Sequence, residues 1–323
     1  MFNGKSIFIS GGTGSFGRKF ITRLLEQYQP KRVVVFSRDE LKQYEMQQTF
    51  NAPCMRYFIG DVRDADRLRQ AMRGIDYVVH AAALKQVPAA EYNPTECIRT
   101  NVNGAENIIA AAIDNGVKKV VALSTDKAAS PINLYGATKL LSDKLFVAAN
   151  NIAGEQQTRF AVVRYGNVAG SRGSVVPFFS KLIADGAQEL PITDERMTRF
   201  MITLEQGVEL VWHAFEDMEG GEIYVKKIPS MKVTDLARVV APDAKQEVIG
   251  IRPGEKLHEE MISADDSRRT IILENRYIVT PVVAEWGYRV PKGELMDEGS
   301  AYRSDTNDMW MSQTDIRDFI SRL

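Results

Sequence analysis

The segment Ser6-Ile7-Phe8-Ile9-Ser10-Gly11-Gly12-Thr13-Gly14-Ser15-Phe16-Gly17 decides the fold of this 323-residue chain. Its first residues form an apolar run typical of a short buried strand, and its glycines fit both GxGxxG and GxxGxxG. The following residues Phe16, Phe20 and Leu24 recur at helical spacing, so the helix packs on the sheet. Glycines between such a strand and helix let the backbone approach a pyrophosphate. The segment predicts a dinucleotide cradle rather than a merely tight turn, formed by Gly11, Thr13, Gly14, Ser15, Phe16 and Gly17.

Further strands and helices alternate regularly along the first half of the chain. This alternation predicts a Rossmann-type α/β fold with a doubly wound parallel sheet. The apolar runs that indicate strands lie at 32–36, 56–59, 76–80, 120–123 and 160–164. A long helical pattern is expected over 94–115. We expect residues 1–165 to form an NADP-binding domain, joined by a later segment near 200–225, and residues 166–323 to form mainly a smaller substrate-binding region and a tail.

The end of the second predicted strand bears on which dinucleotide binds. Ser37, Arg38 and Asp39 follow the apolar run 32–36, about 20 residues past the cradle, and Lys42 comes a helical turn later. A chain that binds NAD usually has a carboxylate here for the ribose 2′-hydroxyl, whereas a serine and two cations suit a 2′-phosphate. We therefore expect NADP. Asp39 keeps NAD as the alternative, and solvated surface charge is the simpler interpretation of the two cations.

Two further strand ends add candidate ligand contacts. Asp61 and Val62 follow the third strand, where a carboxylate can accept from an adenine amino group and an apolar side chain can pack on the ring. Small residues after the fourth strand, among them Ala82, allow close passage of the cofactor. Lys85 follows and is either a substrate contact or a solvated lysine. His80 is expected to be a packed structural residue.

The segment STDKAASPINLYGATK, residues 124–139, carries the catalytic candidates. It begins at the end of a predicted buried strand and enters a helical pattern that contains Tyr135 and Lys139. Their spacing of one helical turn places phenol and ammonium about 5–6 Å apart on one face. A phenol with an ordinary pKa of about 10 acts as a base near neutrality only when a cation stabilises its phenolate. We expect Lys139 to supply that charge.

Three polar residues, Thr125, Asp126 and Lys127, lie between this strand and the helix, at the edge where parallel sheets bind ligands. An acid and a potential base beside a Tyr–Lys pair indicate two proton-transfer devices in one site, which is more than a simple dehydrogenase needs. The simpler interpretation is a helix cap for Asp126 and a solvated lysine for Lys127. The position of the segment behind a glycine cradle favours the catalytic interpretation.

Composition and charge exclude several classes of protein. A net charge of −1, from 41 Lys and Arg against 42 Asp and Glu, gives no reason to expect a nucleic-acid partner. The two cysteines and three histidines have no metal-binding spacing, so we expect reduced thiols and no metal. The chain enters its first strand at once and has no apolar run of about 18 residues. We therefore expect a cytoplasmic protein without a signal peptide or a membrane span.

The regular alternation ends after residue 166. Asn167 stands just outside the sixth strand, and a loop is expected over 170–177. Short elements with turns follow, and the substrate should be bound there; they lie at 190–194, 196–200 and 251–256. From about residue 285 onward the chain is polar and rich in turns, so we expect a peripheral tail.

These motifs together resemble the extended short-chain dehydrogenase/reductase family of nucleotide-sugar enzymes. Within it, the chain is most similar to the inverting UDP-N-acetylglucosamine 4,6-dehydratases that open bacterial pseudaminic acid synthesis, a sugar of flagellin or capsule. The resemblance runs from about residue 4 to 281, and its segments are 37–43, 81–85, 124–129, 164–168 and 252–256. Lys127 stands where dehydratases of dTDP-glucose or GDP-mannose have Glu. Tyr135 stands where membrane-tethered, retaining relatives have Met.

The resemblance implies a lyase that uses a tightly bound NADP in a closed redox cycle. It implies that Tyr135, held by Lys139, takes the proton of the sugar 4-hydroxyl, with Thr125 as a hydrogen-bond partner of that oxygen. Lys127 would be the base at C5, and Asp126 the acid that releases the 6-hydroxyl. A lysine with an ordinary pKa of about 10.4 is a poor base at neutral pH. We therefore expect burial and nearby positive charge to lower the pKa of Lys127.

The resemblance also implies two sets of binding residues. NADP would contact the cradle, Ser37, Arg38, Lys42, Asp61, Val62, Ala82, Tyr135, Lys139 and Val168. UDP-N-acetylglucosamine would contact Lys85, Asn167, Val175, Thr193, Arg199, Arg252 and Glu255. Guanidinium groups suit a diphosphate, although ion pairs around a glycine turn are the simpler interpretation of these arginines.

Three questions stay open at the level of sequence. A UDP-sugar 4-epimerase or a C5-retaining dehydratase could use the same scaffold. A protein that senses NADP without catalysis is an alternative of another class, although it would have no use for all four of Asp126, Lys127, Tyr135 and Lys139. Helices near 94–115 and 135–150 could pair between subunits, which suggests a homo-oligomer, either a dimer or a hexamer.

Overall fold

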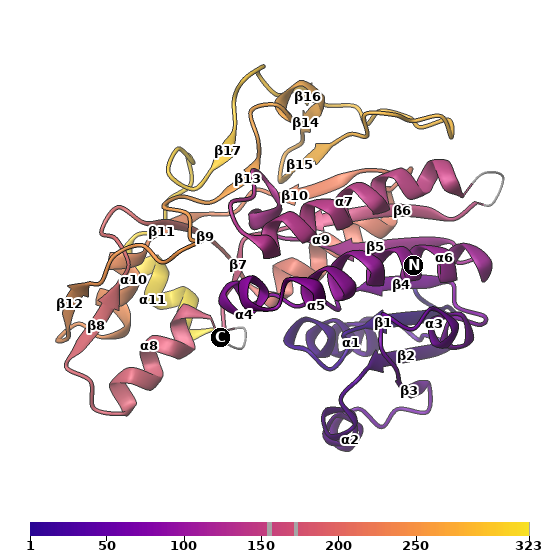
Figure 1. Cartoon of the computed structure of the whole chain (residues 1–323), viewed down its shortest axis with the longest axis horizontal. Coiled ribbons are helices and arrows are strands. Elements are labelled where there is room, and N and C mark those ends of the chain that lie inside the picture. Colours follow the sequence, from indigo (N-terminus) through magenta and orange to yellow (C-terminus); the bar gives the residue numbers. More distant parts are fainter. Residues whose placement is uncertain (154–156, 171–173, 323) are drawn as a thin grey trace.

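A mostly parallel sheet with helices on both faces forms the larger part of the molecule (Figure 1). The computed structural model describes residues 1–153, 157–170 and 174–322, so the middle of the loop expected over 170–177 lies outside the described residues. Within the described residues the sheet has the strand order β16-β14-β15-β10-β6-β5-β4-β1-β2-β3. The α/β fold with a doubly wound parallel sheet, predicted from the sequence, is confirmed.

The sheet is parallel from β3 to β10 and antiparallel at its other edge. Its parallel strands read as continuous apolar runs because both faces are covered. The strands of the sheet are β1 (Ser6–Ser10), β2 (Arg32–Ser37), β3 (Met55–Ile59), β4 (Tyr77–His80), β5 (Lys119–Leu123), β6 (Arg159–Arg164), β10 (Ile223–Lys226), β14 (Thr270–Ile272), β15 (Arg276–Val279) and β16 (Glu294–Leu295).

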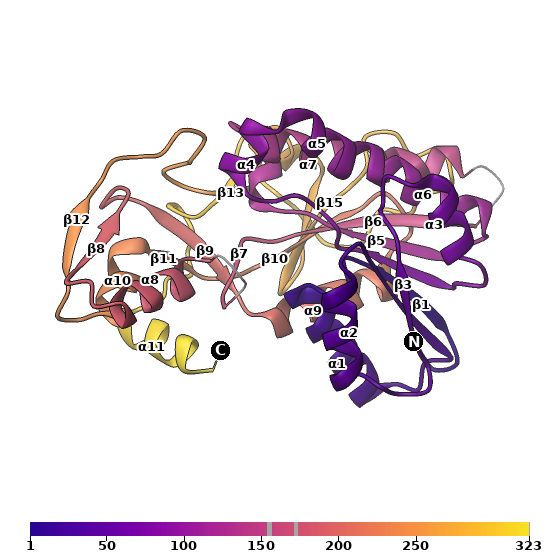
Figure 2. The ribbon, with the colours of Figure 1, turned by 60° about the horizontal axis from the view of Figure 1, so that its bottom comes forward.

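Two layers of helices enclose this sheet, as Figure 2 shows. On one face α1 (Ser15–Gln27) packs against α9 (Leu204–Asp217), and on the other α6 (Gly104–Asp114) packs between α3 (Ala65–Ala71) and α7 (Leu134–Ile152). The remaining helices of this part are short; they are α2 (Glu40–Thr49), α4 (Val87–Tyr92), α5 (Pro94–Ile98) and the 3₁₀ turns η2 (Asp126–Ala128) and η3 (Ser267–Arg269). None of the helices that the structure describes combines the length and the apolar character needed to cross a membrane.

The helix expected over 94–115 is wrong in one respect, because a π-helical turn interrupts it. This turn, η1 (Arg99–Asn103), separates α5 from α6. The wider turn directs the Asn101 side chain to the segment after β4, where it bonds the Leu84 amide at 2.8 Å and the Leu84 carbonyl at 2.9 Å. Asn101 also donates to the Thr138 hydroxyl on α7 at 3.0 Å. The sequence pattern of a helix does not reveal this local change of pitch.

A second, smaller part of the chain lies beside the carboxyl ends of the parallel strands (Figure 1). Its helices, α8 (Val175–Ala184) and α10 (Val233–Val240), enclose a separate apolar cluster that includes Phe179 and Leu190. One short three-stranded sheet and two strand pairs complete it. The sheet has the order β11 (Ser230–Lys232), β9 (Thr198–Ile202), β7 (Asn167–Val168), and the pairs are β8 (Glu189–Ile192) with β12 (Lys245–Val248) and β13 (Glu260–Ile262) with β17 (Tyr302–Arg303).

The peripheral tail expected from residue 285 is wrong for much of that segment. β16 extends the main sheet, and Tyr302 is buried, with its hydroxyl bonded to both the amide and the carbonyl of Ile228. The terminal helix α11 (Gln313–Ser321) buries Ile316 against the second part of the chain. These contacts join residues far apart in the sequence, so a polar local composition did not reveal them.

Candidate active site

One cavity of about 1040 Å³ runs between the two parts of the chain. The carboxyl ends of the parallel strands form one wall, and α8, β9 and the segment before β13 form the other. All the ligand-contact and catalytic residues predicted from the sequence line it, except Asp126, which lies buried directly behind Lys127. Because such a crevice at the strand ends is where open α/β sheets bind ligands, the cavity is the candidate active site.

The glycine segment forms a cradle that leaves no space for side chains. Gly11 has φ +66°, and a Cβ there would lie 2.9 Å from the backbone of Ala81 and Ala82. A Cβ on Gly17 would lie 2.3 Å from the Gly12 carbonyl oxygen. The first amides of α1 have no side-chain cap and no acidic residue beside them. A bare helix N-terminus behind a backbone cradle fits a pyrophosphate, so these residues fit a dinucleotide.

The predicted 2′-phosphate contacts lie at the edge of this cradle and pair with acidic residues. Arg38 lies 3.6 Å from the Asp61 carboxylate, and Lys42 lies 2.6 Å from that of Asp39. Both cations are exposed, and Asp39 also caps α2. Ser37 accepts a hydrogen bond from Gln43. The site therefore offers cations beside carboxylates at the position predicted for the ribose.

Tyr135 and Lys139 lie one turn apart on α7 as predicted, and both are buried. Burial raises the pKa of Tyr135 to about 12, while the charge of Lys127 and a hydrogen bond with Thr125 oppose that rise. Lys127 rather than Lys139 is thus the cation that acts most strongly on the phenol. Burial lowers the pKa of Lys139, and the charge of Asp143, one turn further along α7, opposes this.

Asp143 belongs to a buried network beneath the site. Its carboxylate accepts from the Ser124 hydroxyl at 2.8 Å and pairs with Arg164 at 3.0 Å. Arg164 also donates to the Met261 carbonyl at 2.8 Å. The network ties β5, β6 and α7 to the segment at β13. His80 lies nearby with its Nδ1 2.8 Å from the Ser10 hydroxyl, and burial lowers its pKa to about 3, so it is the neutral structural residue that was expected.

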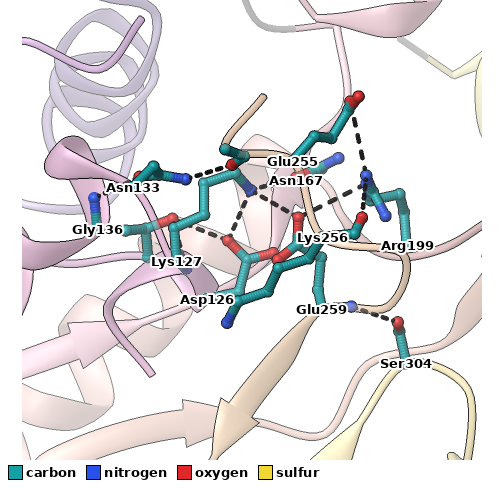
Figure 3. Close-up of polar contacts among 12 residues, drawn as sticks. Asp126, Lys127, Asn133, Gly136, Asn167, Arg199, Glu255, Lys256, Glu259 and Ser304 are labelled. Carbon is teal, nitrogen blue, oxygen red and sulfur yellow. Dashed lines mark hydrogen bonds and ion pairs between the residues drawn. The ribbon is translucent and has the colours of Figure 1, made fainter. Parts of the chain in front are cut away.

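Asp126, Lys127 and Glu259 form a cluster of three charged side chains, in which both carboxylates are buried and the Lys127 side chain is 25% exposed (Figure 3). The Lys127 ammonium lies 3.0 Å from Asp126 Oδ1 and 3.2 Å from Glu259 Oε1. It also donates to Asn167 at 3.4 Å. Thr125 donates to the same Asp126 oxygen at 2.8 Å and caps the short turn η2. This geometry brings an acid and an amine together at the cavity wall.

The cluster overturns one expectation about Lys127. Burial lowers the pKa of its ammonium, but the charges of Asp126 and Glu259 outweigh burial and raise that pKa above its ordinary value. The sequence led us to expect the opposite direction, because nothing in it placed Glu259 here. Burial raises the pKa of Asp126, the charge of Lys127 opposes this, and Glu259 adds to the rise. This shift in the pKa of Asp126 is in the direction that an acid requires.

The predicted diphosphate contacts lie on the opposite wall. Arg199 is buried and donates to the backbone carbonyls of Thr198, Lys256 and Leu257, while Arg252 is exposed and pairs with Glu255 at 2.8 Å. Arg199 also lies 3.7 Å from Glu255 (Figure 3). The contacts present are therefore those of the simpler interpretation, ion pairs around a glycine turn, and both arginines line the cavity.

The other predicted contacts surround the same space. Lys85 follows β4, and burial lowers its pKa. Asn167 and Val168 form β7, Val175 begins α8, Thr193 follows β8, and Ala82 lies where Gly11 approaches the chain. Their position on the cavity wall is consistent with binding, and their individual roles stay predictions.

Glu259 is the site residue that sequence reasoning missed. It lies outside the motif Arg252-Pro253-Gly254-Glu255-Lys256, and its neighbour Glu260 is also acidic. The available signal was its position two residues before the buried pair Met261 and Ile262, because a carboxylate close to a short apolar strand has a chance of being buried. Only the fold reveals that it meets Lys127.

The fold and the site define the class: an extended short-chain dehydrogenase/reductase, with a glycine cradle after β1 and a Tyr-x-x-x-Lys helix after β5. The family model described as polysaccharide biosynthesis protein matches residues 7–281. The chain belongs to this family.

Known proteins similar to the chain include close relatives over its whole length. An inverting UDP-N-acetylglucosamine 4,6-dehydratase of Campylobacter jejuni is 60% identical, with 99% of this chain and 98% of that protein covered. A UDP-glucose 4-epimerase of Rickettsia massiliae is 45% identical, with coverage of 86% and 83%. The crystal structure of Pen from Bacillus thuringiensis is 39% identical and has a TM-score of 0.91, with coverage of 100% and 99%.

Proposed function

We propose that the protein is a UDP-N-acetylglucosamine 4,6-dehydratase that inverts C5. Its product would be UDP-2-acetamido-2,6-dideoxy-β-L-arabino-hexos-4-ulose. The observation that carries the proposal is the contact of 3.0 Å between Lys127 and Asp126, at the same cavity wall as Tyr135 and Thr125. The high identity to a dehydratase over the full length supports it.

The first half of the reaction is oxidation at C4. The Tyr135 oxygen takes the proton of the sugar 4-hydroxyl, and Thr125 holds that oxygen. Because the pKa of Tyr135 is about 12 in the buried site, the phenolate needs a cation, and both Lys127 and the positively charged nicotinamide ring would help. A dinucleotide held in the cradle would supply hydride transfer, from C4 to the nicotinamide and later back to C6.

The second half is loss of water between C5 and C6. The C4 ketone acidifies the C5 hydrogen, so Lys127 takes that proton and the C5–H electron pair forms the C5–C6 double bond. The C6–O bond breaks, and its oxygen takes the proton of Asp126 and leaves as water. After hydride returns to C6, C5 takes a proton from solvent on the face opposite Lys127, and this inverts that centre.

For this step, the one proton that Asp126 and Lys127 share must lie on Asp126, so that Lys127 is a neutral amine. A neutral amine and a neutral acid contain the same number of protons as the ion pair, and 3.0 Å is close enough for a proton to pass between the two groups. The effect of burial, taken apart from the effect of neighbouring charges, is to raise the pKa of Asp126 and to lower that of Lys127. A bound sugar excludes water and so increases burial, which favours the neutral acid and the neutral amine.

NADP is the proposed cofactor, held by the glycine cradle with Arg38 and Lys42 at the 2′-phosphate. Closure of the redox cycle predicts that it stays bound between turnovers. We further propose that the enzyme is a cytoplasmic homo-oligomer and that its product enters pseudaminic acid synthesis, for flagellin or capsule. The diphosphate would draw Arg199 and Arg252 towards it, and Glu255 would then accept from the uridine ribose.

A 4-epimerase is the second candidate, and the 45% identity to a protein of that name supports it. Epimerisation uses Tyr135 and hydride transfer but has no step at C5. The Asp126–Lys127 pair favours dehydration, because a carboxylate as fully buried as that of Asp126 is costly for a protein that has no use for it.

Product analysis decides between the two candidates. Purified protein, incubated with UDP-N-acetylglucosamine, should yield a nucleotide sugar lighter by one water in mass spectrometry. A product of unchanged mass with the 4-hydroxyl inverted would instead support the epimerase. The variant Lys144→Met, which changes an exposed lysine on α7, should leave the yield unchanged.

A further inference from the structure

A buried carboxylate faces Lys127 from the far side of the cavity. Glu259 is 2% exposed, and its Oε1 lies 3.2 Å from the Lys127 ammonium and 3.6 Å from Arg199 Nε (Figure 3). Its second oxygen, Oε2, is buried without a hydrogen-bond partner in the part of the chain that the structure describes. Burying a carboxylate is costly, so a charge in this position needs an explanation.

The backbone at Glu259 is held by the C-terminal segment. The Glu259 amide donates to the Ser304 hydroxyl at 2.9 Å, and the Ser304 amide donates to the Glu259 carbonyl at 2.8 Å. The Ser304 hydroxyl also lies 2.7 Å from that of Thr198, which bonds His258 at 2.8 Å. The carboxylate is therefore presented by a fixed backbone, and this is the arrangement that precise placement of a reactive group requires.

We propose, on the basis of the function proposed above, that Glu259 is a positioning residue for the dehydration step. Its carboxylate, with Arg199 behind it, holds the Lys127 nitrogen against Asp126 and aims it at the sugar. Lys127 has a long flexible chain, and Asp126 alone would hold it from one side only. With Glu259 and Asn167 as further partners, the nitrogen is fixed from three directions.

Glu259 also acts on the proton of the pair. Its negative charge raises the pKa of both Asp126 and Lys127. Among the residues that the structure describes, the other charged or titratable groups that act on this cluster include Arg199 from β9, Lys256 from the segment before β13, and Tyr135 from α7. Burial would raise the pKa of Glu259 itself, but Lys127 and Arg199 outweigh burial and keep that pKa below its ordinary value, so the carboxylate is ionised.

These charges predict how pH governs the rate. The active pair holds one proton, so the rate falls at low pH when the pair gains a second proton and at high pH when it loses the first. Glu259 moves both limits to higher pH. Removing its charge with Glu259→Gln must therefore move both limbs of the profile to lower pH, a result that loss of packing alone would not produce.

The experiment compares Glu259→Gln, Glu259→Asp and wild type in formation of the 6-deoxy product across a pH series. We expect Glu259→Gln to slow kcat about 100-fold, since a small misplacement of a catalytic group has that effect. We expect both limbs of its pH–rate profile to lie at lower pH than in wild type. Glu259→Asp retains the negative charge, but its side chain is one bond shorter and places the carboxylate farther from Lys127. Its kcat should therefore be about tenfold lower, and the limbs of its pH–rate profile should not shift. Glu260→Gln, at the adjacent residue, is the matched control and should behave as wild type.

A second readout separates this proposal from the proposed function. Each variant should still reduce its bound dinucleotide on addition of UDP-N-acetylglucosamine, because oxidation at C4 does not use Glu259. The proposal is overturned if Glu259→Gln keeps the wild-type rate, or loses rate with unshifted limbs, or if Glu259→Asp equals wild type. Absence of any 6-deoxy product from wild type would instead overturn the proposed function.

Discussion

The dinucleotide cradle and the Asp126–Lys127–Glu259 cluster lie in the same cavity but are made in different ways. The cradle comes from one continuous segment, and its specificity lies in backbone shape: Gly11 and Gly17 have no room for a Cβ. The cluster joins η2 to the segment at β13, and its specificity lies in buried charge. A local segment can be recognised from its amino-acid sequence, whereas a cluster of charged residues depends on the whole fold. The comparison predicts different failures when each is altered.

Removal of Lys127 should have the largest effect. In Lys127→Met the base at C5 is gone, so formation of the 6-deoxy product should fall about 10³-fold, the usual range for a lost general acid or base. Asp126→Asn should lose a similar amount. Reduction of the bound dinucleotide by substrate should continue in Asp126→Asn and should be slower in Lys127→Met, which also loses the positive charge that lowers the pKa of Tyr135. The measurement is single-turnover product formation beside absorbance of the reduced nicotinamide, and a Lys127→Met enzyme with more than about a tenth of wild-type turnover would contradict the assignment.

Alteration of the cradle should have an effect of intermediate size, on stability and dinucleotide binding rather than on the chemistry at C5. A Cβ in Gly17→Ala would press against the Gly12 carbonyl, so the free energy of unfolding should fall by about 1–3 kcal/mol and dinucleotide affinity should fall with it. Thermal unfolding with and without added dinucleotide measures both.

Gly116→Ala is the matched control for the cradle. Gly116 also has positive φ, but a Cβ at this position would meet no atom within 4 Å in the described parts of the chain, so the substitution should reduce stability without changing dinucleotide affinity. Equal loss of affinity in both variants would mean that the close approach at Gly17 is not what forms the cradle.

The smallest expected effect is at the exposed rim of the cradle. Arg38→Ala should weaken NADP binding about tenfold and leave NAD binding nearly unchanged, since a guanidinium group selects the 2′-phosphate. Isothermal titration with the two dinucleotides measures the ratio. If NAD binds more tightly than NADP to wild type, Asp39 rather than Arg38 decides the preference.

The two regions also differ in how far the sequence could predict them. The glycines, Asp61 and Ala82 follow successive strands, and strand ends of a parallel sheet meet at one edge, so their common site followed from local pattern. The direction in which the pKa of Lys127 shifts could not be predicted in this way, because it depends on Glu259, which is distant in the sequence. The buried Tyr302 was missed for the same reason: its partner Ile228 is brought to it only by tertiary packing.

The most direct test of the central claim, that Lys127 and Asp126 act at C5 and C6, is the fate of the C5 hydrogen in deuterated water. NMR of the product should show deuterium at C5, an inverted C5 centre and a methyl group at C6, and Lys127→Met should form this product about 10³-fold more slowly. A product that keeps its C5 hydrogen and its 6-hydroxyl would contradict the account.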